Sequence, residues 1–131
     1  MRSLIIICVI TFIISADLKK GCTFLRKNAH KKSVGYSAKY VADALEYAGF
    51  KFTRQVSGYL YHTKGILRKM GFREIPKGKP KAGDVYVQDK TPSHKHGHIA
   101  MFCKQWISDF FQKTDQVFNE DRGAIHYYRF G

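Results

Sequence analysis

Acidic residues are scarce in this sequence. Its 131 residues include 10 Asp and Glu against 23 Lys and Arg, which gives a formal net charge of +13. Such an excess of positive charge indicates a polyanionic partner, and nucleic acid, an anionic membrane surface and an acidic cell-wall polymer all qualify. The sequence has no RNA-binding signature, which argues against a nucleic-acid partner, and no HExxH or CxxC spacing that would support a zinc site.

Long apolar runs are also lacking. The longest, residues 4–14, is too short to span a bilayer comfortably. Arg2 precedes this run, and the small residues Ser15 and Ala16 follow it. This order is typical of a secretory signal peptide over residues 1–16, whereas the alternative is a buried strand or helix of the domain. The prediction is a secreted, extracellular chain, or a periplasmic one if the source is a bacterium.

Cysteines are few, with three in the whole chain. Signal cleavage would leave Cys22 and Cys103, which permit one internal bridge in an oxidising compartment. Spacing alone does not show whether their Cα atoms lie close enough, so a bridge and free thiols both remain open. The sequence also lacks internal repeats and an interdomain linker, so residues 17–131 are predicted to form a single domain.

Hydrophobic periodicity indicates helices first and strands afterwards. The pattern predicts helices over residues 19–30, about 37–48, and about 55–70, the last interrupted by Gly58 and Gly65. Alternating segments predict strands over residues 84–88, 98–102, 106–110 and 125–130. This order predicts an α+β fold in which N-terminal helices pack on an antiparallel sheet.

Three polar residues are candidates for catalysis. Ser37 stands in the first turn of the second helix, where a helix N-terminus stabilises a thiolate or an oxyanion; the alternative is a simple cap residue. His98 opens an apolar strand, and Asp109 lies in the following one. A turn centred on residues 103–104 would place His98 opposite Asp109 on one face, where an acid could orient the imidazole. A surface histidine and an edge-strand charge are the simpler readings.

A metal site formed by alternate histidines competes with this arrangement. His94, His96 and His98 would share a face of an extended segment, and imidazoles suit zinc. Pro92 and Lys95 make the segment a loop and add an unfavourable charge. The sequence therefore favours a protein without a metal or another cofactor.

The sequence resembles the papain-like CHAP and NlpC/P60 amidases. The stretch YSAKYVADAL (residues 36–45) is similar to their nucleophile helix, and AGDV (82–85), GHIA (97–100) and WISDF (106–110) are similar to their sheet motifs. Within that superfamily the chain most resembles the second group of type VI secretion amidase effectors, and with its signal also the secreted, domesticated relatives in animals. The resemblance covers about residues 18–130.

The resemblance implies an NlpC/P60 fold and a bacteriolytic peptidoglycan amidase that acts by Cys-His-Asp acyl transfer. Its implied substrate is an amide of cell-wall peptides, at the D-Ala–diaminopimelate cross-link, and a cognate inhibitor protein is a possible partner. The catalytic positions would be Ser37, His98 and Asp109, and we place substrate contacts at Tyr36, Gly97 and Trp106. We expect a monomer.

Position 37 departs from the family because a serine stands where cysteine is usual. A serine hydroxyl is far harder to deprotonate than a thiol, so the chain is expected to bind substrate and turn it over poorly. The interpretation is an engineered, inactive substrate-trapping form, with a natural degenerate homologue as the alternative. The competing functions are a non-catalytic peptidoglycan-binding protein and a cationic antimicrobial protein that acts on membranes.

Overall fold

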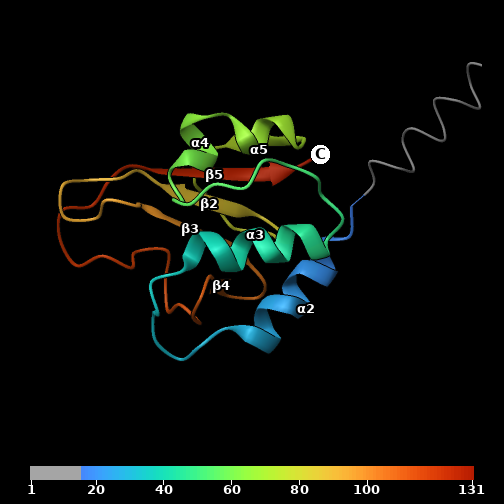
Figure 1. Ribbon diagram of the computed structural model, residues 1–131, viewed down its shortest axis with the longest axis horizontal. Helices are drawn as coiled ribbons and strands as arrows, with labels where there is room; N and C mark the ends of the chain where they lie inside the picture. Colours follow the sequence, from blue (N-terminus) through green and yellow to red (C-terminus); the bar gives the residue numbers. More distant parts are fainter. Residues whose placement is uncertain (1–15) are drawn as a thin grey trace, which may run out of the picture.

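The computed structural model describes residues 16–131, so the predicted signal segment lies outside the described residues except for Ala16. The chain forms helices followed by an antiparallel sheet, as the α+β prediction requires (Figure 1). Helices α2 (Leu18–Asn28) and α3 (Ser37–Tyr47) come first. Two short helices follow, α4 (Leu60–Thr63) and α5 (Ile66–Lys69). No helix among residues 16–131 is long and apolar enough to cross a membrane.

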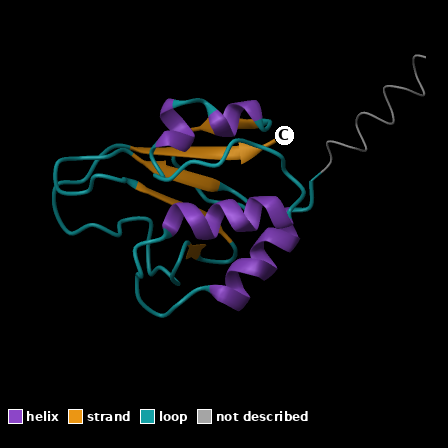
Figure 2. Cartoon of the chain, in the orientation of Figure 1, coloured by secondary structure: helices purple, strands orange, loops and turns teal. Residues whose placement is uncertain are grey.

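The sheet contains five antiparallel strands in the order β1-β5-β2-β3-β4. They are β1 (Phe72–Ile75), β2 (Val85–Gln88), β3 (His98–Phe102), β4 (Trp106–Ile107) and β5 (Ile125–Phe130). The C-terminal strand β5 pairs with both β1 and β2, which places the end of the chain inside the sheet. Figure 2 shows long loops gathered at one end of the strands, next to the start of α3.

The main core lies between the helices and one face of the sheet. Helix α3 buries Val41, Ala44 and Leu45, the side that its apolar period predicts. Helix α2 crosses α3 closely because Gly21 has no side chain: a Cβ there would lie 2.9 Å from the carbonyl oxygen of Ala44. The other face of the sheet carries a smaller aromatic cluster made of Tyr86, Ala100 and Trp106, with Phe102, Ile125 and Tyr127 packed against them.

Three elements differ from the sequence-based expectations. The third helix is two short helices, because Gly65 takes a left-handed conformation (φ 66°) between them. Strand β1 was not predicted, since only Phe72 among its residues is buried and the strand lacks a clear alternation. The strand expected over residues 106–110 ends at Ile107, after which the chain turns back on itself.

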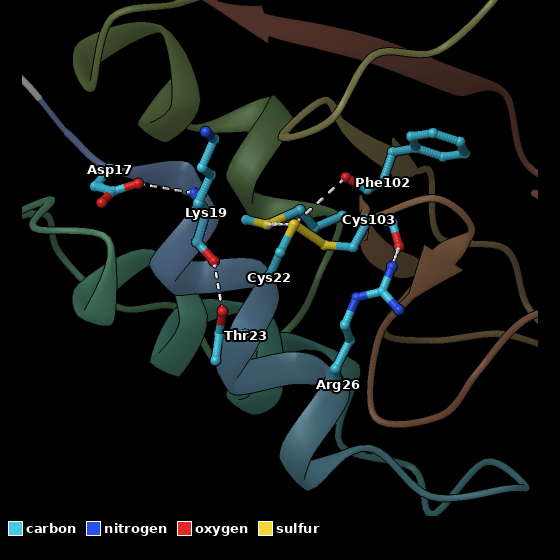
Figure 3. Close-up of a disulfide and its surroundings, with 8 residues drawn as sticks. Asp17, Lys19, Cys22, Thr23, Arg26, Phe102 and Cys103 are labelled. Atoms are coloured by element: carbon cyan, nitrogen blue, oxygen red, sulfur yellow. Dashed lines mark hydrogen bonds between the residues drawn. A yellow bond between two sulfur atoms is a disulfide. The ribbon is translucent and has the colours of Figure 1, made fainter.

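A disulfide joins Cys22 of α2 to Cys103 in the turn after β3, with Cα atoms 5.5 Å apart (Figure 3). The sequence left this bridge open. Beside it, the guanidinium of Arg26 donates a hydrogen bond to the carbonyl oxygen of Cys103. The bridge therefore ties the N-terminal helix to the β3–β4 turn, two segments separated by 81 residues.

Removal of this bridge should destabilise the fold without changing it. The double variant Cys22→Ala/Cys103→Ala should lose about 2–5 kcal/mol of unfolding free energy, because the unfolded chain regains the entropy of a long closed loop. Urea unfolding followed by circular dichroism measures the change. Equal midpoints for the oxidised native protein and the double variant would contradict the expectation, and Thr23→Ala on the exposed side of α2 is the matched control.

Candidate active site

Ser37 is the first residue of α3, and its side chain is free. The N-cap residue is Tyr36, which gives no side-chain hydrogen bond to the helix, so Ser37 is not the capping residue. Within residues 16–131 no hydrogen bond of Ser37 Oγ to another residue is found. The first-turn N–H groups at this end are therefore open, and they carry the positive end of the helix dipole. Gly35 has φ 82°, which permits the sharp turn into the helix.

Ser37 opens into a cleft of about 480 Å³ between the start of α3 and the segment before α4. The side chain of Tyr36, one of the predicted substrate contacts, is 61% exposed at its rim. Two cations also line the cleft, but Arg54 is paired with Asp43 and Glu46, which neutralise much of its charge. The lining residues are Gly35, Tyr36, Ser37, Ala38, Lys39, Arg54, Gln55, Val56, Gly58 and His96.

Asp109 is fully buried beneath the loop that leads to Ser37. Its Oδ2 accepts hydrogen bonds from the backbone N–H of Val34 (2.7 Å) and Tyr36 (3.3 Å) and from the hydroxyl of Ser33 (3.4 Å). Its Oδ1 accepts a hydrogen bond from the hydroxyl of Ser108 at 3.2 Å. The carboxylate thus holds the backbone immediately before the candidate nucleophile.

The predicted pairing of Asp109 with His98 is wrong. The β3–β4 register places Phe102 opposite Trp106, one residue beyond the predicted partner Gln105. The cause is a three-residue turn in which Lys104 has a positive φ of 69°. A slip of one residue sends every side chain of a strand to the other face.

His98 instead bonds to Gln112. Its Nε2 lies 2.8 Å from Gln112 Oε1, and the amide nitrogen of Gln112 donates to Tyr86 Oη and to the carbonyl oxygen of Thr114. Because the amide oxygen of Gln112 accepts, His98 carries its proton on Nε2 and leaves Nδ1 as the basic nitrogen. Gln112 therefore occupies the orienting role that the sequence assigned to Asp109. Nothing in the local sequence pattern singles out Gln112, which follows the tight turn after β4.

Burial lowers the pKa of His98 below its ordinary value, while the hydrogen bond that its Nε2–H donates to Gln112 and the negative charge of Asp109 act in the opposite direction. The imidazole is 6% exposed. Within residues 16–131 no hydrogen-bond partner of His98 Nδ1 is found. The ring is thus neutral at neutral pH, with Nε2 bonded to Gln112 and Nδ1 without a hydrogen-bond partner among residues 16–131.

Asp109 and Gly58 connect Ser37 with His98. The Asp109 carboxylate bonds to the N–H of Tyr36, the residue before Ser37, and its charge also acts on His98. Gly58 lines the cleft beside Ser37, and a Cβ on Gly58 would lie 2.8 Å from the carbonyl carbon of His98. No hydrogen bond between Ser37 Oγ and His98 is found within residues 16–131. His98 is not among the residues that line the cleft.

Two of the predicted substrate contacts serve the fold. Trp106 is buried in the aromatic cluster, with its ring edge-on to Tyr86 at 4.9 Å, and does not line the cleft. Gly97 has φ 56°, and a Cβ there would lie 2.2 Å from the carbonyl oxygen of Gln88, so it allows a close approach of two backbones. Sequence reasoning missed Gly58, Gln55 and Arg54, which do line the cleft.

The alternate histidines do not converge on one point. His94 Nε2 bonds to the carbonyl oxygen of Glu120, His96 Nδ1 lies 2.5 Å from Ser57 Oγ, and His98 bonds to Gln112. These three imidazoles are therefore held by different partners rather than arranged around an ion.

Comparisons with known proteins place the chain in a family. A scan of protein-family models gives no match, and a search of curated proteins gives none either. Among solved structures, the chain is similar to one in the native type VI effector–immunity complex Tae3-Tai3 from Ralstonia pickettii. It shares 32% identity with a TM-score of 0.73, and the match covers 88% of this chain and 99% of the other. The chain belongs to the Tae3 effector family.

The selenomethionine form of the same Tae3-Tai3 complex matches with 32% identity and a TM-score of 0.71, covering 83% of this chain and 98% of the other. Tae3 membership agrees with the predicted resemblance to type VI amidase effectors at the level of the effector class. It differs in the subgroup, since the sequence pointed to the second group and the matching structures carry the name Tae3.

The buried carboxylate of this Tae3 relative should contribute strongly to stability. Asp109→Ala would leave the N–H groups of Val34 and Tyr36 without their acceptor, so we expect a loss of about 2–3 kcal/mol of unfolding free energy. Urea unfolding measures the loss. The exposed carboxylate Glu120 provides the control, since Glu120→Ala should change stability little. A similar small change for Asp109→Ala would show that the loop is held by other contacts.

The pKa of the His98 imidazole should lie below 6.5, the ordinary value, and Gln112→Leu should lower it further because the hydrogen bond that the ring donates to Gln112 favours the charged form. As the pH falls, His98 therefore binds a proton in the unfolded chain at a higher pH than in the folded chain. The contribution of His98 to stability is therefore fully present above pH 6.5 and is lost as the pH falls through the folded-state pKa. Nitrogen-detected NMR of the ring measures both effects, and a pKa at or above 6.5 would contradict them.

Proposed function

We propose that this Tae3-family chain has the architecture of an antibacterial peptidoglycan amidase. Its papain-like site is centred on position 37. The observation that carries the proposal is a helix N-terminus without a side-chain cap, which opens with Ser37 into a cleft, in a chain that belongs to an effector family. An uncapped N-terminus supplies backbone donors where an oxyanion would form.

The proposed mechanism is acyl transfer. A nucleophile at position 37 attacks the amide carbonyl carbon, and His98 Nδ1 takes its proton. The C–N bond then breaks as the imidazolium returns that proton to the leaving amine, and water hydrolyses the acyl intermediate. Gln112 holds the imidazole by its Nε2–H, while the backbone N–H of residue 37 donates to the oxyanion. Asp109 positions the loop before the nucleophile rather than the base.

With serine at position 37 we propose that turnover is poor and substrate binding is retained. Cysteine is a few per cent thiolate at neutral pH without help, whereas a serine hydroxyl needs a strong base at the moment of attack. His98 is a weak base here because burial lowers its pKa. The backbone donors are independent of the side chain, so the cleft can still hold the amide.

The substrate we propose is the D-Ala–diaminopimelate cross-link of peptidoglycan, approached with the help of the +13 net charge. We also infer that residues 1–16 direct secretion, and that the chain acts as a monomer with a cognate inhibitor as a possible partner. The last inference follows the Ralstonia pickettii structures, in which the effector is bound to an immunity protein.

A non-catalytic peptidoglycan-binding protein is the second candidate. The serine at position 37 is the observation that favours it, since this substitution removes the thiol while the cleft and the His98–Gln112 bond remain. Introducing a thiol at position 37 distinguishes the two candidate functions, because only the amidase should then cleave peptidoglycan.

Introducing that thiol should create or strongly raise activity. Ser37→Cys should release muropeptides from purified peptidoglycan, and adding His98→Ala should reduce the rate by about 10²–10⁴-fold because the general base is lost. Chromatography of the digested peptides measures both. Thr53→Cys is the matched control, since it places an exposed thiol outside the start of α3.

Folded Ser37→Cys that sediments with peptidoglycan but releases no muropeptide would refute the enzyme proposal and favour the binding protein. Adding Gln112→Ala to Ser37→Cys should slow turnover more than it weakens sedimentation with the wall, since Gln112 acts through His98. Dye leakage from anionic vesicles that persists in the His98→Ala variant would instead indicate action on membranes.

A further inference from the structure

Two histidines and two carboxylates gather on the helix side of the sheet, and none of them lines the cleft. His62 of α4, Asp89 after β2 and His126 of β5 each offer one ligand atom, and these atoms all lie within 4.8 Å of one another. All three side chains are partly exposed, so an ion in solution can reach them. From this convergence of two imidazoles and a carboxylate we propose a binding site for a divalent transition-metal ion, of which Zn²⁺ is the best-matched common example.

His126 has the two-sided environment of a metal-binding imidazole. Its Nε2 lies 3.0 Å from Asp89 Oδ1, and its Nδ1 lies 3.3 Å from Glu74 Oε2. Imidazoles that bind metals commonly donate their second N–H to a carboxylate, which fixes the tautomer and the ring orientation. Glu74 supplies that carboxylate, and it is itself held by Arg68 at 2.8 Å. The ion would enter between His126 Nε2 and Asp89.

His62 also has a partner for its second nitrogen. Its Nδ1 lies 2.5 Å from the hydroxyl of Tyr128, which leaves Nε2 to bind the ion. The Tyr128 hydroxyl, buried in the core, can accept the Nδ1–H when Nε2 binds a metal.

The rings of His62 and His126 stack in the structure, with centroids 3.5 Å apart and planes 9° from parallel. Because a ring nitrogen binds a metal in the plane of its ring, a shared ion requires one ring to turn. His62 is the ring that can turn, since it is held at one nitrogen whereas His126 is held at both. Metal binding therefore predicts loss of this stacking.

Asp89 is held in place by its backbone. Its N–H donates to the carbonyl oxygen of Ala124 at 2.9 Å, and Gly123 packs so closely that a Cβ there would lie 2.3 Å from the Asp89 carbonyl oxygen. Because Glu74 is paired with Arg68, the negative charge that faces the ion comes from Asp89.

Equilibrium dialysis of the full chain against Zn²⁺ tests the site. We expect about one ion per chain and a rise in thermal midpoint with zinc concentration. His126→Ala and His62→Ala should abolish the specific binding, and Glu74→Gln should weaken it by about tenfold because it acts on the imidazole. His94→Ala is the matched control, since its imidazole stacks on Phe118 and lies outside the cluster.

Electron paramagnetic resonance with Cu²⁺ counts the imidazole nitrogens bound to the ion. A histidine with a purely structural role would not contribute to this coupling. Coupling to two imidazole nitrogens is expected in the native chain and to one in His62→Ala. The proposal is overturned if zinc does not bind, if binding survives both histidine replacements in folded protein, or if His94→Ala removes it. None of these readouts depends on hydrolase activity, so the proposed amidase function and the metal site fail separately.

Discussion

The buried carboxylate of Asp109 is the constraint on which the proposed site depends. It receives hydrogen bonds from two backbone N–H groups and two hydroxyls, and so fixes the loop of residues 33–36 against the segment after β4. A buried charge is tolerated only when it is satisfied in this way. The same negative charge acts on His98. The loop that leads into α3 and the electrostatics of His98 are therefore linked through one side chain.

The first two helices and most strands follow from local periodicity, whereas the pairing between strands does not. The apolar stripe of α3 predicts its buried face, and the alternation of residues 125–130 predicts β5 with its full extent. The β3–β4 register depends on the conformation of Lys104, and a positive φ at a lysine has no signal in the sequence. This conformation shifts the register by one residue from the one that would place Asp109 opposite His98.

The candidate site is predictable where chemistry is local and unpredictable where it depends on tertiary contact. Ser37 follows from a glycine, a helix start and a familiar motif, and His98 follows from its place at a strand opening. Gln112 reaches His98 because the chain turns back after β4, a contact that depends on the whole turn. The His62–His126 pair joins residues 64 positions apart on α4 and β5, so no spacing rule could bring them together.

In the proposed mechanism, binding and catalysis use different parts of residue 37, so a serine there can leave the site in place. The oxyanion donors and the dipole belong to the backbone of α3, and the turn into the helix depends on Gly35 and Asp109. None of these contacts involves the side chain of residue 37. In the proposed mechanism, exchanging sulfur for oxygen therefore raises the cost of forming the nucleophile while it leaves the fold, the cleft and the recognition of a carbonyl unchanged.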